Sequence, residues 1–222
     1  MAIDSSQAAG FTRRATRRLQ TIEEALDHAV AIMEADGVGA LSMSEIARRL
    51  GIRQPSLYKY FPSLHAVYDA LFARGLALME AAVMATVTPL PAGVARIRAG
   101  AKAWIRCAVD NPALAQLLVW RPVPGFQPTE ETFGGSTRQM DQLRTEFAAA
   151  VDRGELNPEG GTPEALRLYT MVLSGVISQQ MANQPGAAFD TGLFTRLIDD
   201  ALDMFFARYS VPQGGSDAKP RP

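Results

Sequence analysis

The chain has 222 residues and a formal net charge of −1, with 22 lysines and arginines against 23 aspartates and glutamates. This length is enough for one large or two modest domains with a well-buried core. The single cysteine, Cys107, excludes an internal disulfide framework, and two histidines (His28 and His65) beside it cannot complete a zinc-type cluster of the usual ligands. We therefore expect no bound metal and no cofactor.

Two stretches could suggest export or a membrane span, and neither meets the requirements. The arginine pairs near the N-terminus are followed by LQTIEE rather than by an apolar segment, so they do not form a twin-arginine export signal. The most hydrophobic stretch, about 75–95, is interrupted by Glu80, Pro89 and Pro91, which argues against a membrane span. We expect a cytoplasmic protein with no membrane partner.

Helical periodicity recurs along the chain, whereas alternating β-branched segments do not. Thr21-x-x-Glu24 has the spacing of a capping box, and it predicts a helix from about residue 21 to Asp36-Gly37. Ser63 is expected to cap a long helix that reaches about residue 86. Further helices are predicted over 93–110, 112–120, 129–153, 163–184 and 192–208, with a loop at 121–128 and a disordered tail from Pro212. The predicted fold class is all-α with about nine helices.

Residues 41–61, LSMSEIARRLGIRQPSLYKYF, carry the most specific pattern. Ser42 and Ser44 are candidate N-caps, and Ser42-x-x-Glu45 has capping-box spacing. Gly51 can adopt the positive φ of a helix C-cap, and Pro55 suits the first turn of a second helix. Two short helices around a glycine turn predict a helix-turn-helix, with an ordinary helical hairpin as the alternative.

Basic residues cluster in this region although the overall charge is balanced. Residues 1–62 hold eight lysines and arginines against seven acids, and the basic ones fall in two groups. Such clustering is the electrostatic pattern expected for phosphate contact, while a solvated arm and a charged helix face are the alternative. The two groups are Arg13, Arg14, Arg17 and Arg18, and Arg48, Arg49, Arg53 and Lys59.

Over about 21–72 the sequence resembles the tetracycline-repressor (TetR) family of bacterial transcriptional regulators, in the run LSMSEIARRLGIRQPSLYKYFPSLHAVYDAL. The resemblance implies that Ser42, Tyr58 and Tyr60 contact phosphates and that Phe61 locks the recognition helix into the core. One residue departs from the family pattern, because Leu64 stands where a phosphate-binding lysine is usual. The departure puts one ionic contact in question and leaves the fold assignment intact.

The recognition helix, expected at about 54–60, would enter the DNA major groove. Gln54 can pair with adenine, Arg53 and Lys59 with guanine or phosphate, and Ser56 with either. One such unit covers too few base pairs, so a homodimer on a palindromic operator is expected. The full set expected at DNA is Arg13, Arg14, Arg17, Ser42, Arg53, Gln54, Pro55, Ser56, Tyr58, Lys59 and Tyr60.

The resemblance also implies a C-terminal half that binds a small-molecule effector and forms the dimer. Aromatic residues and Cys107 are candidates for an apolar chamber, with plain core as the alternative for each. Cys107 itself is expected to be a buried small hydrophobe rather than a thiol sensor. The chamber candidates are Trp104, Cys107, Trp120, Phe126, Phe147 and Tyr169, and the dimer candidates are Leu173, Ile177, Phe194, Ile198, Leu202 and Phe205.

We therefore expect a ligand-responsive regulator, most simply a repressor, and not an enzyme. The expected organisation is a basic flexible arm (1–20), a DNA-binding domain (21–66), a ligand-binding and dimerisation domain (67–210) and a tail (211–222). A DNA-binding protein without ligand-controlled release is the alternative. A helical enzyme is the weakest choice, since Ser56-x-x-Lys59 matches S-x-x-K without the companion motifs of that chemistry.

Overall fold

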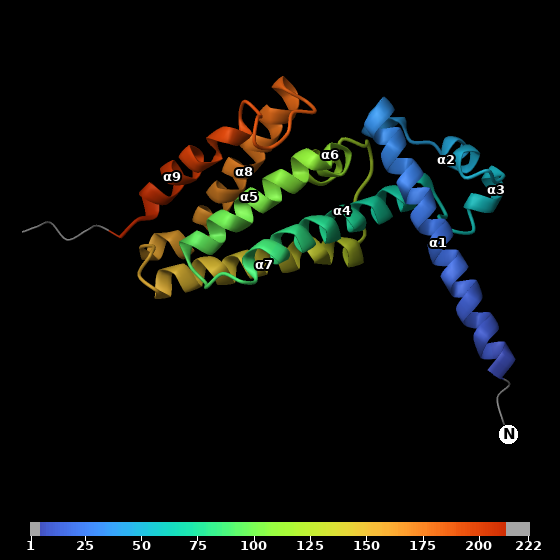
Figure 1. The fold of residues 1–222 in the computed structure, drawn as a ribbon, viewed down its shortest axis with the longest axis horizontal. Coiled ribbons are helices and arrows are strands. Elements are labelled where there is room, and N and C mark those ends of the chain that lie inside the picture. The colour runs from blue at the N-terminus through green and yellow to red at the C-terminus, as the bar shows by residue number, and fades with distance from the viewer. Residues whose placement is uncertain (1–4, 212–222) are drawn as a thin grey trace, which may run out of the picture. The chain divides into compact units, whose positions relative to one another are not determined.

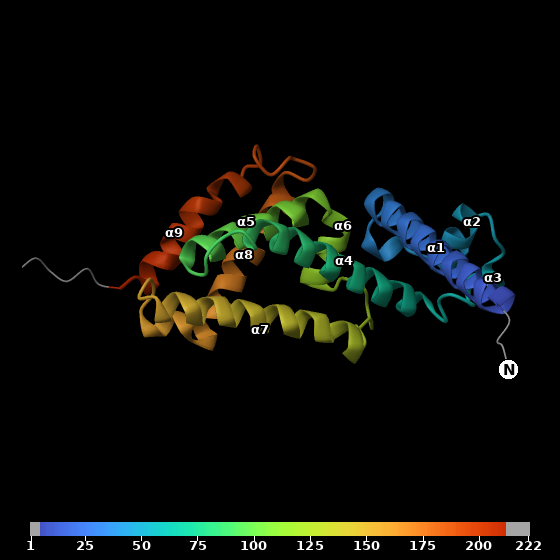
Figure 2. The same cartoon turned by 60° about the horizontal axis from the view of Figure 1, so that its bottom comes forward.

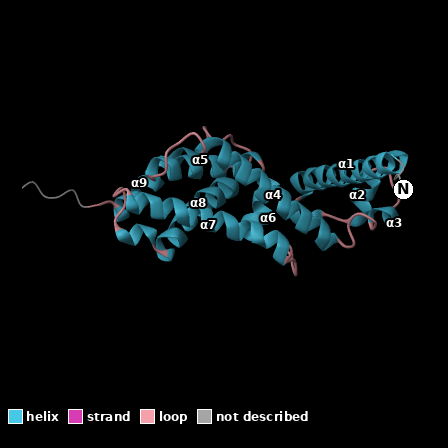
Figure 3. Ribbon diagram, turned by 90° about the horizontal axis from the view of Figure 1, so that it is seen from below, coloured by secondary structure: helices cyan, strands magenta, loops and turns pink. Residues whose placement is uncertain are grey.

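The computed structural model describes residues 5–211, with side chains from Arg14 onward. Over this range the chain forms nine α-helices, three short 3-10 helices and no strand (Figures 1 and 3), apart from an isolated bridge between Leu156 and Ser210. The all-α class predicted from the sequence is confirmed. The α-helices are α1 (Ser5–Asp36), α2 (Met43–Arg49), α3 (Gln54–Leu57), α4 (Leu64–Val87), α5 (Val94–Asp110), α6 (Pro112–Trp120), α7 (Glu130–Asp152), α8 (Pro163–Asn183) and α9 (Ile198–Tyr209).

The first helix begins well before the predicted start at Thr21. α1 runs without interruption from Ser5 to Asp36, and the Thr21 hydroxyl donates a hydrogen bond to the Arg17 carbonyl one turn earlier (3.0 Å). Because the preceding turn supplies helical hydrogen bonds, Thr21 is an interior residue and not an N-cap. The predicted helix start at Thr21 is wrong, and residues 5–20 of the predicted flexible arm are helical.

Later helix boundaries agree closely with the local capping signals. The Ser63 hydroxyl accepts a hydrogen bond from the Ala66 amide (3.1 Å), Thr162 caps α8 through the Ala165 amide (3.3 Å), and Gly154 has φ +69° after α7. The last helix is the exception, since residues 195–197 form a 3-10 turn and α9 starts at Ile198 rather than 192. The tail predicted to be disordered from Pro212 lies outside the described residues.

The chain divides into two compact units, and each unit is built from two separate stretches of the sequence. Unit 1 comprises Met1–Leu76 together with Pro112–Phe133, and unit 2 comprises Ala77–Asn111 together with Gly134–Pro222. The division differs from the boundary expected at residues 66 and 67. α6 and the loop after it therefore belong to the same unit as the helix-turn-helix.

The core of unit 1 joins the helix-turn-helix to α1, α4 and α6. Leu57 and Ile46 are fully buried in this core. The Tyr68 hydroxyl on α4 donates a hydrogen bond to the Val38 carbonyl (2.8 Å). Phe126, from the loop after α6, is 5% exposed, with its ring centroid 5.7 Å from that of Tyr68. Packing of this loop against α4 explains why the two stretches fold as one unit.

The core of unit 2 is aromatic. Figures 1 and 2 both show α5 and α8 side by side, and the Tyr169 hydroxyl on α8 donates to the Ile97 carbonyl on α5 (3.1 Å). Phe147 is fully buried and stacks on Phe206, with ring centroids 6.4 Å apart. Burial raises the pKa of Tyr169, so this phenol stays neutral and donates its hydrogen bond.

One helix is long and apolar enough to cross a membrane by length and composition. α4 contains an 18-residue window of mean hydropathy 1.6, of which 33% is buried, although Glu80 and the prolines after it had argued against such a span. Its Val67, Leu71 and Phe72 lie in the core of unit 1. A single helix of this length and composition is weak evidence for a membrane span, since apolar core helices of other proteins share both features.

Candidate nucleic-acid interface

The turn between α2 and α3 has the geometry that the sequence predicted. Ser42 is the N-cap of α2, and its hydroxyl accepts a hydrogen bond from the Glu45 amide (3.2 Å). After the helix, Gly51 has φ +68°, its amide donates to the Arg48 carbonyl (3.1 Å), and the Ile52 amide donates to the Ala47 carbonyl (3.0 Å). These paired bonds form a Schellman cap, which turns the chain sharply toward α3.

The second helix is shorter than the predicted 54–60. α3 spans Gln54–Leu57 with Pro55 in its first turn, and the following turn is tightened by a bond from the Tyr60 amide to the Leu57 carbonyl (2.9 Å). Phe61 precedes Pro62, and a residue before proline is pushed out of helical geometry. Helical geometry therefore cannot continue past Tyr60, and Phe61 buries its ring (4% exposed), as expected for the residue that anchors this segment.

The residues expected at base edges lie on the outside of α3 and the turn after it. Leu57 is fully buried, whereas Arg53, Gln54, Pro55 and Lys59 are exposed. Tyr58 is 46% exposed, and its hydroxyl accepts a long hydrogen bond from the Gln54 amide group (3.5 Å). Ser42, Ser56 and Tyr60 are half-buried. A short helix with one buried side and one polar, unshielded side can present those side chains to a partner.

α1 contributes a contact that the sequence pattern did not single out. The Arg18 guanidinium donates to the Lys59 carbonyl (2.9 Å) and lies over the Tyr60 ring, 5.2 Å from its centroid. Arg18 therefore ties α1 to the carboxyl end of the α3 segment. Arg14 and Arg17 are exposed on the same helix, and the side chain of Arg13 lies outside the described ones.

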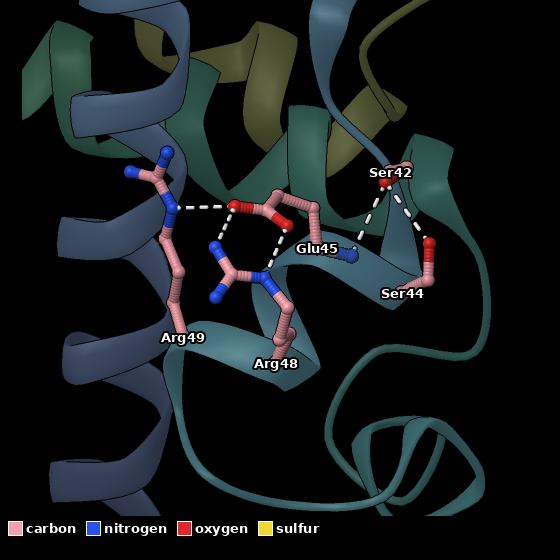
Figure 4. A network of polar contacts seen from close by, with 5 residues as sticks. All are labelled: Ser42, Ser44, Glu45, Arg48 and Arg49. Carbon is pink, nitrogen blue, oxygen red and sulfur yellow. Dashed lines mark hydrogen bonds and ion pairs between the residues drawn. The ribbon is translucent and has the colours of Figure 1, made fainter.

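The charged residues of α2 form one network (Figure 4). The Glu45 carboxylate accepts two hydrogen bonds from Arg48 (Nε at 2.8 Å and a terminal nitrogen at 2.7 Å) and one from Arg49 Nε (2.8 Å). These bonds lower the pKa of Glu45 to about 2 and raise that of Arg48. Both arginines are thus held by the acid that lies on the same helix.

At the position where the resemblance led us to expect a lysine, Leu64 opens α4 and packs half-buried against the unit 1 core. An aliphatic side chain offers no ionic contact at this position. The next residue, His65, has its ring centroid 6.0 Å from that of Phe126.

The predicted chamber residues are not brought together. Trp120 and Phe126 belong to unit 1, where Trp120 is 42% exposed and Phe126 is core. Phe147 and Tyr169 pack on each other in unit 2 with centroids 5.2 Å apart. Phe126 fills the core of unit 1, and the prediction that it lines an effector chamber with Phe147 stays a prediction.

Two chamber candidates lie on α5 in unit 2. Trp104 is half-buried there, and Cys107 is 8% exposed. Burial, the largest contribution, raises the pKa of the Cys107 thiol. A thiol with a raised pKa is a poor nucleophile, which agrees with the prediction of a buried small hydrophobe.

Most of the predicted dimer residues are buried within the chain itself. Leu173, Ile177, Ile198, Leu202 and Phe205 are each 8% exposed or less, and Phe194 is half-buried. A side chain already enclosed by its own unit has little surface left for a second copy, and the prediction that these residues form the dimer interface stays a prediction. The large apolar residues left outside on these helices are Met171 (68% exposed), Leu197 (47%) and Met204 (78%).

The fold and this surface define a helix-turn-helix transcriptional regulator with a separate helical unit. Two family models match the chain: "Bacterial regulatory proteins, tetR family" over residues 25–71, and "Tetracyclin repressor-like, C-terminal domain" over residues 97–201. The chain belongs to the TetR family of bacterial transcriptional regulators. Its relatives in this family are transcription factors and not enzymes.

Two curated relatives are similar over part of their length. The uncharacterized HTH-type transcriptional regulator YobS of Bacillus subtilis is 29% identical over 87 residues, which are 39% of this chain and 45% of that protein. An uncharacterized HTH-type regulator of Mycobacterium tuberculosis is 26% identical over 137 residues, 62% of this chain and 63% of that protein. The chain thus spans about half to two thirds of these relatives.

Solved structures share the fold over nearly their whole length. A protein of unknown function from Rhodococcus sp. RHA1 has a TM-score of 0.70 at 22% identity, covering 86% of this chain and 96% of that one. AibR, in complex with isovaleryl coenzyme A and operator DNA, has a TM-score of 0.66 at 18% identity (84% and 98% covered). FadR from Bacillus subtilis, in complex with stearoyl-CoA, has a TM-score of 0.66 at 13% identity (83% and 97% covered).

Proposed function

We propose that this regulator binds a palindromic operator as a homodimer, represses transcription from it in the cytoplasm, and is released by a small molecule bound in unit 2. The observation that carries the DNA-binding part is the two-sided character of α3. Leu57 anchors the helix in the core, while Gln54, Tyr58 and Lys59 stand outside. A recognition helix needs this division between an anchored side and a side open to the groove.

In this proposal α3 supplies the base contacts and its neighbours supply the phosphate contacts. The Gln54 amide can pair with the N6 and N7 edge of adenine, and Arg53 and Lys59 can pair with guanine or phosphate. Ser42 and Tyr58 offer hydroxyls, which position the protein without selecting sequence. Arg14 and Arg17, exposed along α1, add cationic contacts to the backbone.

A gel-shift titration of Gln54→Ala and Tyr58→Phe tests these roles. We expect Gln54→Ala to weaken operator binding by about 1–3 kcal/mol and to relax the base preference at one position of each half-site. Tyr58→Phe should weaken operator and random DNA alike, because a phosphate contact carries no sequence information. Gln142→Ala, on the exposed face of α7, is the matched control. Unchanged binding in both test variants would refute the assignment.

The exposed methionines support a dimer that uses the outer faces of α8 and α9. Met171 and Gly175 are one turn apart on α8, and a Cβ built on Gly175 would meet no atom within 4 Å. Leu197 and Met204 lie seven residues apart, which places them on one side of the α9 segment. Large apolar side chains left outside beside a small residue suit close helix–helix contact with a second copy.

A small molecule with an apolar part, such as the acyl chain of a coenzyme A thioester, is the class of effector we propose. Two relatives of the same fold were solved with coenzyme A thioesters, isovaleryl in AibR and stearoyl in FadR. Unit 2 of this chain has an aromatic interior and a half-buried Trp104 on α5. Release of DNA would follow from a higher affinity of the effector for the dimer geometry that does not fit the operator.

Thermal melts with a series of coenzyme A thioesters and free coenzyme A test the effector class. We expect one range of acyl lengths to raise the melting temperature, and the same compounds to release operator DNA in a gel shift. Stabilisation by free coenzyme A as strong as by the thioesters would refute an acyl effector.

A regulator should also protect one or two palindromic sites in a footprint, whereas diffuse protection would favour the architectural alternative.

A further inference from the structure

Glu45 is the acid within α2, and it holds both basic side chains of that helix. Its Oε1 accepts from Arg48 and Arg49, and its Oε2 accepts from Arg48 Nε, so the Arg48 guanidinium is gripped at two nitrogens (Figure 4). The charges of α2 are two cations and one anion, a sum of +1. Without the carboxylate the same helix would carry +2.

The Arg48 side chain is otherwise open to its surroundings. It is 70% exposed, whereas that of Arg49 is 27% exposed. In a helix-turn-helix the first helix crosses the phosphate backbone, so a free arginine at this point can bind phosphate on any sequence. The bidentate grip of Glu45 occupies the Nε edge of the Arg48 guanidinium and holds a negative charge beside it, so a phosphate approaching the other edge would also meet the carboxylate.

The ends of α2 do not depend on this ion pair. Ser42 caps the start of the helix through its own hydroxyl, and the Gly51 turn closes the other end through backbone bonds. An exposed ion pair within one helix contributes little to stability. A negative group at this position also repels phosphate.

We propose that Glu45 is a specificity-determining residue, which keeps Arg48 from binding phosphate and so lowers the affinity of the regulator for non-operator DNA. The inference rests on the proposed DNA-binding function. Glu45 touches no base in this account and acts through Arg48. Replacing Glu45 should therefore raise the affinity for random DNA more than the affinity for the operator, because base contacts from α3 already contribute to operator binding.

The expected size follows from counterion release. Each phosphate contact contributes about −0.9 to the slope of log K against log salt, so one new contact per protomer adds about −1.8 for a dimer. Between 50 and 200 mM salt, the affinity of Glu45→Gln for random DNA should then fall by a factor roughly 12 times larger than the factor by which the wild-type affinity falls.

The experiment measures binding of the full chain to a random 30-base-pair duplex from 50 to 200 mM salt. Glu164→Gln is the matched control, because it also removes an acid from an exposed i,i+3 ion pair, with Arg167 (70% exposed) on α8. The double variant Glu45→Gln/Arg48→Ala restores the charge of α2 to +1 and should return the slope to the wild-type value. Circular dichroism melts confirm that each variant is folded.

Three outcomes separate the possibilities. A steeper slope in Glu45→Gln, absent from Glu164→Gln and reversed by the added Arg48→Ala, supports the inference. A wild-type slope in Glu45→Gln, or an equal steepening in Glu164→Gln, overturns it while leaving DNA binding intact. If wild-type protein binds neither random duplex nor any selected sequence, the proposed function fails instead.

Discussion

Phe126 provides a sharp test of how the chain is divided, because the sequence assigned it to an effector chamber and the structure places it in the DNA-binding unit. Its side chain is 5% exposed, and its ring lies 5.7 Å from Tyr68, 6.0 Å from His65 and 6.5 Å from Phe72, measured between centroids. Truncating a buried phenylalanine costs about 3–5 kcal/mol in lost transfer energy and cavity formation. Since Phe126 lies in a loop that can partly collapse, we expect Phe126→Ala to cost about 3 kcal/mol.

For a chain of this size, that loss corresponds to a fall of roughly 6–12 °C in melting temperature. Differential scanning calorimetry with and without operator DNA is the assay, and Phe133→Ala is the control. Phe133 is also in unit 1 but is 42% exposed, so its truncation should cost about 1 kcal/mol or less. If Phe126→Ala melts like the wild type and instead alters effector affinity, the placement of this ring in the core below the helix-turn-helix is refuted.

Three further predictions follow from single residues. Gly51→Ala should lower the free energy of unfolding by about 1–2 kcal/mol in urea titrations, because φ is +68° there while space for the methyl group is open; equal stability would contradict a left-handed turn. The ion pairs that lower the pKa of Glu45 to about 2, from 4.5 ordinarily, contribute their small stabilisation fully above pH 4.5 and lose it as the carboxylate is protonated. The slight melting-temperature advantage of wild type over Glu45→Gln should therefore shrink as pH falls from 5 toward 2, and a constant difference would exclude the ion pair as its source. Met204→Glu, at a side chain 78% exposed, should shift sedimentation from dimer to monomer without changing the far-ultraviolet spectrum, and a dimer that survives it would place the interface elsewhere.

Local signals predicted most of the helix boundaries. Ser42 and Ser63 both accept the capping hydrogen bonds that their sequence context suggested, and Gly51 has the positive φ expected of a helix C-cap. Each depends on a few neighbouring residues, which is why the sequence suffices. The predicted helix start at Thr21 was wrong for a related reason. The turn before Thr21 contains no residue that stops a helix, so α1 continues through it.

The division into units and the outer surfaces depend on packing between distant residues. Nothing adjacent to Phe126 distinguishes a loop that joins the helix-turn-helix core from one that lines a chamber. Likewise Leu202 and Met204 are both large and apolar and lie on one helix, yet the first is fully buried and the second is 78% exposed. The ion pairs of Glu45 lay within reach of sequence analysis, because acids and arginines three and four residues apart on a helix are neighbours.

Selection of binding sequences from random DNA, with wild type and Gln54→Ala in parallel, tests the central claim that α3 reads the operator. We predict a palindromic consensus for the wild type, and for Gln54→Ala the same consensus with information lost at one symmetric pair of positions. Identical consensus sequences for the two proteins, or no enriched sequence for the wild type, would contradict the assignment of α3 as the recognition helix.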